Sequence, residues 1–107
     1  MTTFDKRKES FEAKFAHDAE LQFKAAARRN KLLGLWVAGL IGLSGDEATE
    51  YAKSVVRADL AEPGDEDVFK KVRADLDKAE VEQSDHQIRR TMDELMAQAI
   101  EQIRTEV

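Results

Sequence analysis

The feature that most constrains this chain is an uncharged run of twelve residues, LLGLWVAGLIGL, at positions 32–43. A helix of that length spans about 18 Å, because each residue adds about 1.5 Å. The hydrocarbon core of a bilayer is about 30 Å thick and needs about 20 apolar residues to cross it. The run therefore predicts a core helix of a soluble protein, without direct insertion into a membrane.

On a helical wheel this run has two different sides. Large side chains share one broad face: Leu33, Trp36, Val37, Leu40 and Leu43. Small residues form a ridge roughly opposite: Gly34, Ala38 and Gly42. A helix that is apolar on all sides is expected to be buried on all sides. We therefore predict that Trp36 is buried and that the other helices pack around this one.

The composition favours one small helical domain. The chain has 107 residues, of which 36% are charged, and only five Gly and one Pro, which suits helix throughout. The absence of cysteine excludes disulfides and cysteine metal sites. Charged residues follow the first few positions with no apolar run behind them, so we expect no signal peptide and a cytoplasmic location.

Charge is distributed unevenly along the chain. Residues 1–43 carry a net charge of +3 and residues 44–107 a net charge of −8. An acidic body argues against nucleic-acid binding. The N-terminal region is mildly basic and could therefore bind an acidic partner.

Residues 2–20 are predicted to form an amphipathic helix. Phe4, Phe11 and Phe15 share one face at spacings of seven and four residues, and charges occupy the other faces. Two interpretations remain open. The Phe face could extend the core face of the next helix, although Gln22 and Arg29 interrupt that face. Alternatively, the segment is a detachable helix that binds a groove in a partner.

The rest of the chain divides into four helices. The first spans about 20–43 and ends in a break at 42–45. Ser44 with Glu47, and Ser84 with Gln87, have the spacing of capping boxes that begin the second and fourth helices. The second ends near residue 61, before Pro63, and Asp65 is the expected N-cap of the third. With short connections and no strand pattern, these helices predict an all-α, antiparallel four-helix bundle.

Few residues suggest chemistry. A di-metal helical bundle has Glu three residues before each ligand His, but Lys14 and Gln83 stand at those positions relative to His17 and His86. We therefore predict that the chain is not an enzyme and has no catalytic residue, metal or cofactor. We interpret three neighbouring cations as a solvated basic face of the helix: Arg28, Arg29 and Lys31. They could also give weak binding of ATP or ADP, but no glycine-rich phosphate loop accompanies them.

Two stretches have a familiar sequence. FEAKFAHDAE at 11–20 and RRNKLLGLW at 28–36 closely resemble the zeta subunit of alphaproteobacterial F-type ATP synthases. The resemblance continues through YAK at 51–53, EPG at 62–64, DVF at 67–69 and MDEL at 92–95. It covers essentially the whole chain.

The resemblance implies an inhibitor of ATP hydrolysis whose N-terminal helix enters a catalytic interface between alpha and beta subunits. Residues 1–19 would be the inhibitory segment, mobile and partly disordered when free, and residues 20–107 the anchoring bundle. Within the segment we select six contact residues: Phe4, Arg7, Lys8, Phe11, Lys14 and Phe15. The implied partners are the alpha, beta and gamma subunits of the membrane-bound synthase, reached through its catalytic head by a chain that is monomeric when free. The alternatives are a nucleotide-binding regulatory bundle and a helix-groove adaptor for another target.

Overall fold

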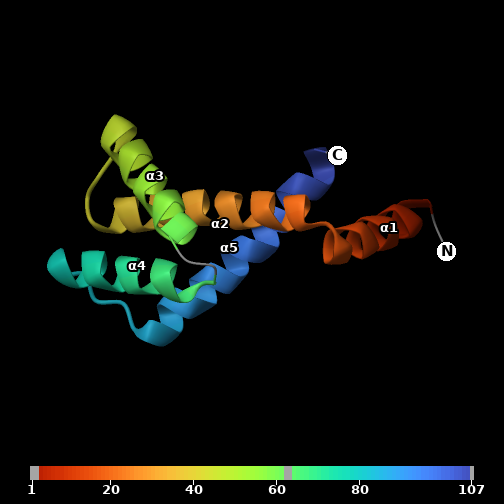
Figure 1. Ribbon diagram of the computed structural model, residues 1–107. Coiled ribbons are helices and arrows are strands. Elements are labelled where there is room, and N and C mark those ends of the chain that lie inside the picture. Colours follow the sequence, from red (N-terminus) through yellow and green to blue (C-terminus); the bar gives the residue numbers. More distant parts are fainter. Residues whose placement is uncertain (1–2, 62–63, 107) are drawn as a thin grey trace.

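The computed structural model describes residues 3–61 and 64–106, and for residues 3–8 and 61 it describes the helix alone. Within these residues there are five helices and no strand, which confirms the predicted all-α class (Figure 1). The helices are α1 (Thr3–His17), α2 (Ala19–Leu40), α3 (Gly45–Ala61), α4 (Glu66–Lys78) and α5 (Asp85–Glu106).

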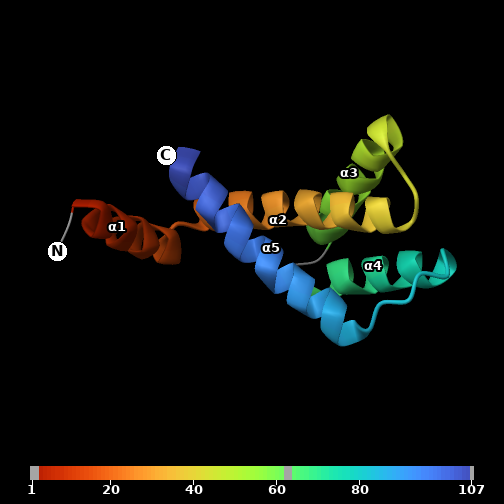
Figure 2. The same cartoon turned by 180° about the vertical axis from the view of Figure 1, so that it is seen from behind.

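Residues 32–40 of the apolar run lie in α2, and α2 is the helix that contacts each of the other four. Seen from both sides, α5 crosses α2 obliquely, and α1 continues outward beyond the end of α2 (Figures 1 and 2). The molecule is accordingly elongated, with extents of 50 × 28 × 26 Å. The helix that carries the apolar run is therefore the one that the others contact, as the sequence predicts.

Close packing between α2 and α3 depends on Gly34. A Cβ atom at this position would lie 2.5 Å from the Cα atom of Ala52 and 3.0 Å from its Cβ atom. Ala38, one turn further on, is also fully buried. The predicted ridge of small residues is therefore buried at these two positions, and at Gly34 it lets the α3 backbone approach.

The end of α2 differs from the prediction, because the helix stops at Leu40 rather than near Leu43. Gly42 has a φ of +87°. The Leu43 N–H donates to the Ala38 carbonyl at 2.8 Å, and the Gly42 N–H donates to the Gly39 carbonyl at 3.4 Å. This pair of bonds is a Schellman motif, so Gly42 belongs to the turn and not to the ridge.

Burial of α2 on all sides was also a wrong prediction. Leu35 is 39% exposed, and Trp36 is half-buried against the edge of the core. The neighbouring helices cover only part of the circumference of α2. An apolar side chain on the uncovered part therefore remains in contact with water.

Helices α2 to α5 share one hydrophobic cluster, which we call the main core. Its buried members are Leu33, Val37, Val55, Val68, Phe69, Val72, Leu76, Ile88 and Met92. The α4 residues among them recur at helical spacing, as expected for an inward stripe. At its edge the Arg89 guanidinium of α5 lies 3.9 Å from the centre of the Phe69 ring.

The residues predicted to cap the helix starts agree with the structure to different degrees. At α5 the capping box is confirmed, because the Ser84 N–H donates to Gln87 Oε1 at 2.8 Å and the Gln87 N–H donates to Ser84 Oγ at 3.0 Å. Asp65 does occupy the N-cap position of α4, but its side chain makes no capping hydrogen bond. Its carboxylate instead accepts a bond from Arg29 at 2.8 Å. Ser44 directly precedes α3, and Pro63 lies outside the described residues.

Candidate functional site

A single extended residue joins α1 to α2. Asp18 has φ −110° and ψ 102°, and its carboxylate accepts from the N–H groups of Glu20 at 3.0 Å and Leu21 at 3.2 Å. These bonds satisfy free donors at the start of α2. On the other side, Gln22 Nε2 donates to the carbonyl of Phe15 at 3.0 Å and to that of Ala16 at 3.2 Å. The side chains of Asp18 at the joint and Gln22 in α2 thus bind free backbone groups at both helix ends.

The Phe face of α1 meets the bundle just beside this joint. Phe11 is 8% exposed and packs with Leu21 and Ala25 of α2 and with Ile103 of α5. The rings of Phe11 and Phe15 have centroids 6.1 Å apart. Phe15, Met96 and Ile100 are partly buried around them. We call this group the junction cluster; among the described residues it is separate from the main core.

The other candidate contacts of the N-terminal segment have different surroundings. Lys14 is exposed in the last turn of α1. For Phe4, Arg7 and Lys8 the structure describes the helix but not the side chains, so it gives no contacts for them. Of the six predicted residues, the structure brings Phe11 and Phe15 together.

The three candidate nucleotide contacts do not form one cluster. Lys31 is exposed. Arg28 binds both carboxylate oxygens of Glu106 and lies 3.4 Å from Gln102 Oε1. This hydrogen bond to Glu106 raises the pKa of Arg28 and lowers the pKa of the Glu106 carboxyl. Arg28 therefore ties α2 to the C-terminal end of α5.

Arg29 is a buried structural residue, and the predicted solvated face is wrong at this position. Its side chain is 2% exposed, and its Nε donates to Asn30 Oδ1 at 2.7 Å while its Nη2 donates to Asp65 Oδ1 at 2.8 Å. Asn30 in turn donates to Asp59 Oδ2 at 2.9 Å. This network links α2 to the end of α3 and the start of α4. The sequence signal for this buried network is an Asn next to an Arg in the middle of a helix, and our prediction did not use it.

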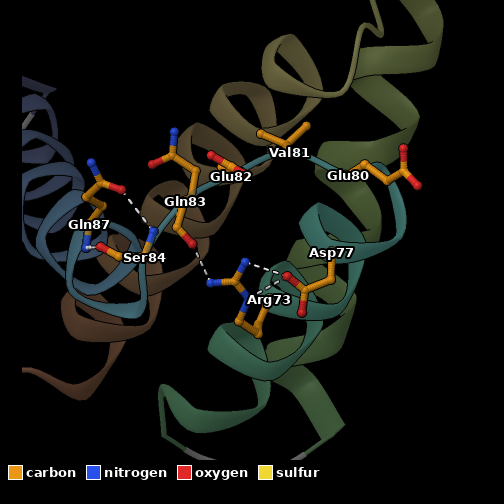
Figure 3. A pocket seen from close by; sticks show the side chains of 8 residues that line it. All are labelled: Arg73, Asp77, Glu80, Val81, Glu82, Gln83, Ser84 and Gln87. Carbon is orange, nitrogen blue, oxygen red and sulfur yellow. Dashed lines mark hydrogen bonds and ion pairs between the residues drawn. The ribbon is translucent and has the colours of Figure 1, made fainter.

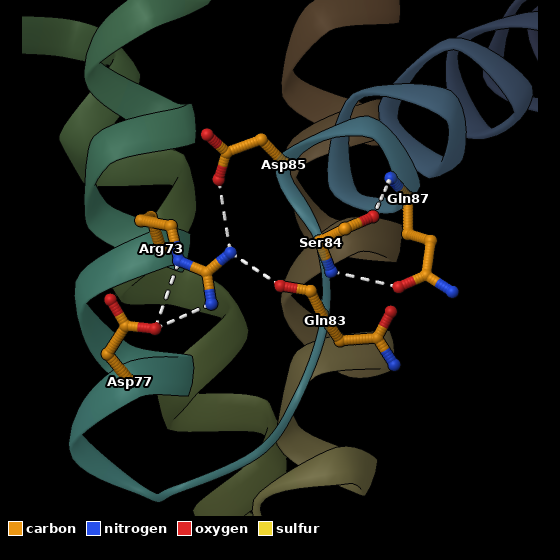
Figure 4. Close-up of polar contacts among 6 residues, drawn as sticks. All are labelled: Arg73, Asp77, Gln83, Ser84, Asp85 and Gln87. Atoms are coloured by element: carbon orange, nitrogen blue, oxygen red, sulfur yellow. Dashed lines mark hydrogen bonds and ion pairs between the residues drawn. The ribbon is translucent and has the colours of Figure 1, made fainter.

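A hollow of about 750 Å³ lies where the 79–84 connection passes between α4 and α5 (Figure 3). Arg73 reaches into it and donates to Asp77 Oδ1 at 3.1 Å, to Asp85 Oδ1 at 3.1 Å and to the Gln83 carbonyl at 2.5 Å (Figure 4). The bond to Asp77 is the main reason that the pKa of Arg73 is raised. Because this cation already has three oxygen partners, it holds the connection in place rather than offering a site for an anion.

Within the described parts of the chain, no three His, Asp or Glu side chains lie close enough to hold a metal ion. Among the same residues, no helix has both the length and the apolar character needed to cross a bilayer.

Comparison with known families decides the relationship. The family model for ATPase inhibitor subunit zeta matches residues 1–102, which run from α1 through most of α5. The chain belongs to the ATPase inhibitor subunit zeta family. This match confirms the resemblance inferred from the sequence. It covers the N-terminal segment as well as the helices that carry the main core.

A solved structure supports the same relationship. The zeta-family chain is similar to a protein determined by solution NMR, with 50% sequence identity and a TM-score of 0.71 over 81% of this chain and 99% of the other. No curated protein matches the chain. Family membership supports a regulatory role as an ATPase inhibitor, and therefore an association with the ATP synthase.

Proposed function

We propose that this protein inhibits ATP hydrolysis by inserting α1 into a catalytic interface between the alpha and beta subunits of the F-type ATP synthase. Residues 1–19 are the inhibitory segment, and residues 20–107 form an antiparallel four-helix bundle that anchors it. The observation that carries the proposal is the family match across α1 together with the attachment of α1 at one end. A one-residue joint and one small cluster connect α1 to the bundle.

The energetics of this attachment favour transfer to a partner. Isolated helices shorter than about 12–15 residues are marginal in water, and α1 has 15. Burying a Phe side chain contributes about 1.5–3 kcal/mol, so the contacts of Phe11 and Phe15 with the bundle are ones that a partner groove can replace. We therefore propose that α1 is mobile when the protein is free and becomes fixed on binding.

Six residues of the segment contact the partner in this proposal. The apolar contacts come from Phe4, Phe11 and Phe15, and the charged ones from Arg7, Lys8 and Lys14. The alpha and beta subunits form the groove, and the gamma subunit lies within reach of the inserted end. Binding takes place on the cytoplasmic side, at the catalytic head of the membrane-bound enzyme.

ATP hydrolysis by the isolated catalytic head, titrated with the intact chain, tests the proposal. We expect wild-type protein to inhibit, and the triple variant Phe4→Ala, Phe11→Ala, Phe15→Ala to need a much higher concentration, because a few buried anchors usually dominate interface affinity. Glu12→Ala, at an exposed position on the same helix, is the matched control and should inhibit like wild type. Equal inhibition by the triple variant would contradict the assignment of the Phe face.

A further inference from the structure

One surface of the bundle differs in chemistry from the rest of this acidic protein. From residue 21 to residue 43 the chain has four cations and no carboxylate, and two of these cations, Lys24 and Lys31, are exposed. The large hydrophobic side chains that are exposed among the described residues also lie on α2 and α3. They are Phe23 (62% exposed) and Leu35 (39%) on α2, and Leu60 (63%) on α3.

Two adjoining hollows extend along this side of the molecule. One, of about 620 Å³, lies between α2 and α3 and is lined by Lys31, Leu35, Thr49, Ala52, Lys53, Val56 and Arg57. The second, of about 480 Å³, continues toward Phe23 and the end of α5. Lys31 and Val56 line both hollows. We call this continuous region the α2–α3 surface, defined by Phe23, Lys31, Leu35, Lys53, Val56 and Arg57.

The α2–α3 surface has an apolar floor and a cationic rim. Along α2, this side of the surface runs from Phe23 through Lys31 to Leu35: Phe23 and Lys31 line the same hollow, and Lys31 and Leu35, about one helical turn apart, line the other. From Phe23 to Leu35 this side is about 18 Å long. Lys31, Lys53 and Arg57 are exposed around the floor. Two acidic groups at the edges are already paired, Glu106 with Arg28 and Glu50 with Lys53.

We propose that the α2–α3 surface docks an acidic amphipathic helix of the catalytic head, about three turns long. Its apolar face would cover Leu35 and Val56, as in other helix-in-groove complexes, and its carboxylates would face the cationic rim. Charge complementarity selects an acidic occupant, because the exposed Lys31 and Arg57 would repel a basic helix, whereas Lys53 is already paired with Glu50. This proposal rests on the proposed function, to which it adds a second contact.

The position of the surface explains what a second contact would do. Phe23 lies on the helix that directly follows the joint at Asp18. A partner helix bound here therefore holds the bundle beside the interface that α1 enters. Two linked contacts raise the effective concentration of the second one once the first has formed. Docking of the bundle thus increases affinity without adding a residue to the inhibitory segment.

The test measures binding of the full-length chain to an isolated catalytic head by isothermal titration calorimetry, with ATP hydrolysis as a second readout. The test variants are the pair Lys31→Glu, Arg57→Glu and the pair Phe23→Gln, Leu35→Gln, all at exposed positions of the α2–α3 surface. Lys70→Glu with Lys78→Glu makes the same charge change at exposed positions on α4 and is the matched control. Thermal melting of each variant establishes that its bundle is folded.

We expect each test pair to raise the Kd about tenfold and the control pair to change it less than about twofold, with maximal inhibition at saturation retained. The charge pair should also lose much of the salt dependence of wild-type binding. If wild type inhibits and the test pairs bind as tightly as the control, the docking proposal fails and the inhibitory function stands. A wild-type chain that neither binds nor inhibits overturns both. Unchanged head binding together with a wild-type dimer that the test pairs abolish assigns the surface to a second copy, which also overturns the proposal.

Discussion

The main core and the junction cluster hold their parts of the molecule in different ways. The main core combines nine buried side chains from four helices, and seven of them are completely inaccessible to water. The junction cluster has four buried side chains, and only Phe11 among them comes from α1. Removal of α1 therefore leaves every member of the main core with its partners.

In the proposed mechanism, this difference separates folding from inhibition along the chain. Loss of the main core unfolds α2 to α5 together, whereas loss of the Phe11 contact releases one helix. Regions with few buried contacts open at low free energy without global unfolding. The inhibitory role proposed for α1 requires this property, because the helix would have to exchange its contacts with the bundle for contacts with a partner. The first two predictions below compare the two clusters directly.

Leu33→Ala should give the largest effect. Leu33 is fully buried in the main core, and truncation of such a residue to Ala costs about 2–5 kcal/mol. Urea denaturation followed by circular dichroism measures this loss in the free energy of unfolding. A loss below about 1 kcal/mol would show that the main core does not hold the bundle together.

Phe11→Ala should have a smaller and more local effect. The cost is limited to the free energy that holds α1 on the bundle, at most about 1.5–3 kcal/mol for one Phe. Hydrogen exchange should accelerate at amides of α1 and remain slow at those of α2 around Leu33. Faster exchange throughout the main core would show that the two clusters form one cooperative unit.

Ser84→Ala tests the end of α5 nearest the main core. Loss of the bond from the Gln87 N–H should cost about 1 kcal/mol, since Ser84 Oγ accepts it at 3.0 Å. Because Ile88 and Met92 follow directly and belong to the main core, the loss should appear in global unfolding. Ser10→Ala, at an exposed position in α1, is the control and should leave the urea midpoint unchanged.

The other end of α5, beside the junction cluster, should show the smallest effect and a dependence on pH. Arg28 lowers the pKa of Glu106 in the folded protein, so their pairing stabilises above the ordinary Glu pKa of about 4.3 and is lost as pH falls through the folded value. Glu106→Gln should therefore melt slightly below wild type at pH 7, and this difference should shrink toward pH 3. A difference independent of pH would contradict an electrostatic origin.

Features set by neighbouring residues could be predicted from the sequence. The capping box at Ser84, the inward stripe of α4 and the ridge of small residues at Gly34 and Ala38 each depend on spacing within a few positions. The pairing of Phe11 with Phe15 on one face of α1 is local in the same sense. A period or a cap motif is sufficient evidence for features of this kind.

Features that join distant segments could not be predicted. Burial of Arg29 depends on Asp65, which the fold brings to the side of α2, and burial of Phe11 depends in part on Ile103. Trp36 is only half-buried because coverage by neighbouring helices, and not its own hydrophobicity, determines its exposure. A single sequence contains the residues but not these pairings.

The most direct test of the account is ATP hydrolysis by the catalytic head in the presence of a chain that lacks residues 1–15. The deletion removes Phe11 and Phe15 and retains every residue of the main core. We predict that inhibition is lost while the helical content of the remaining chain and its cooperative melting are retained. A truncated chain that inhibits as well as the full-length protein would place the inhibitory surface on α2 to α5 and contradict the account.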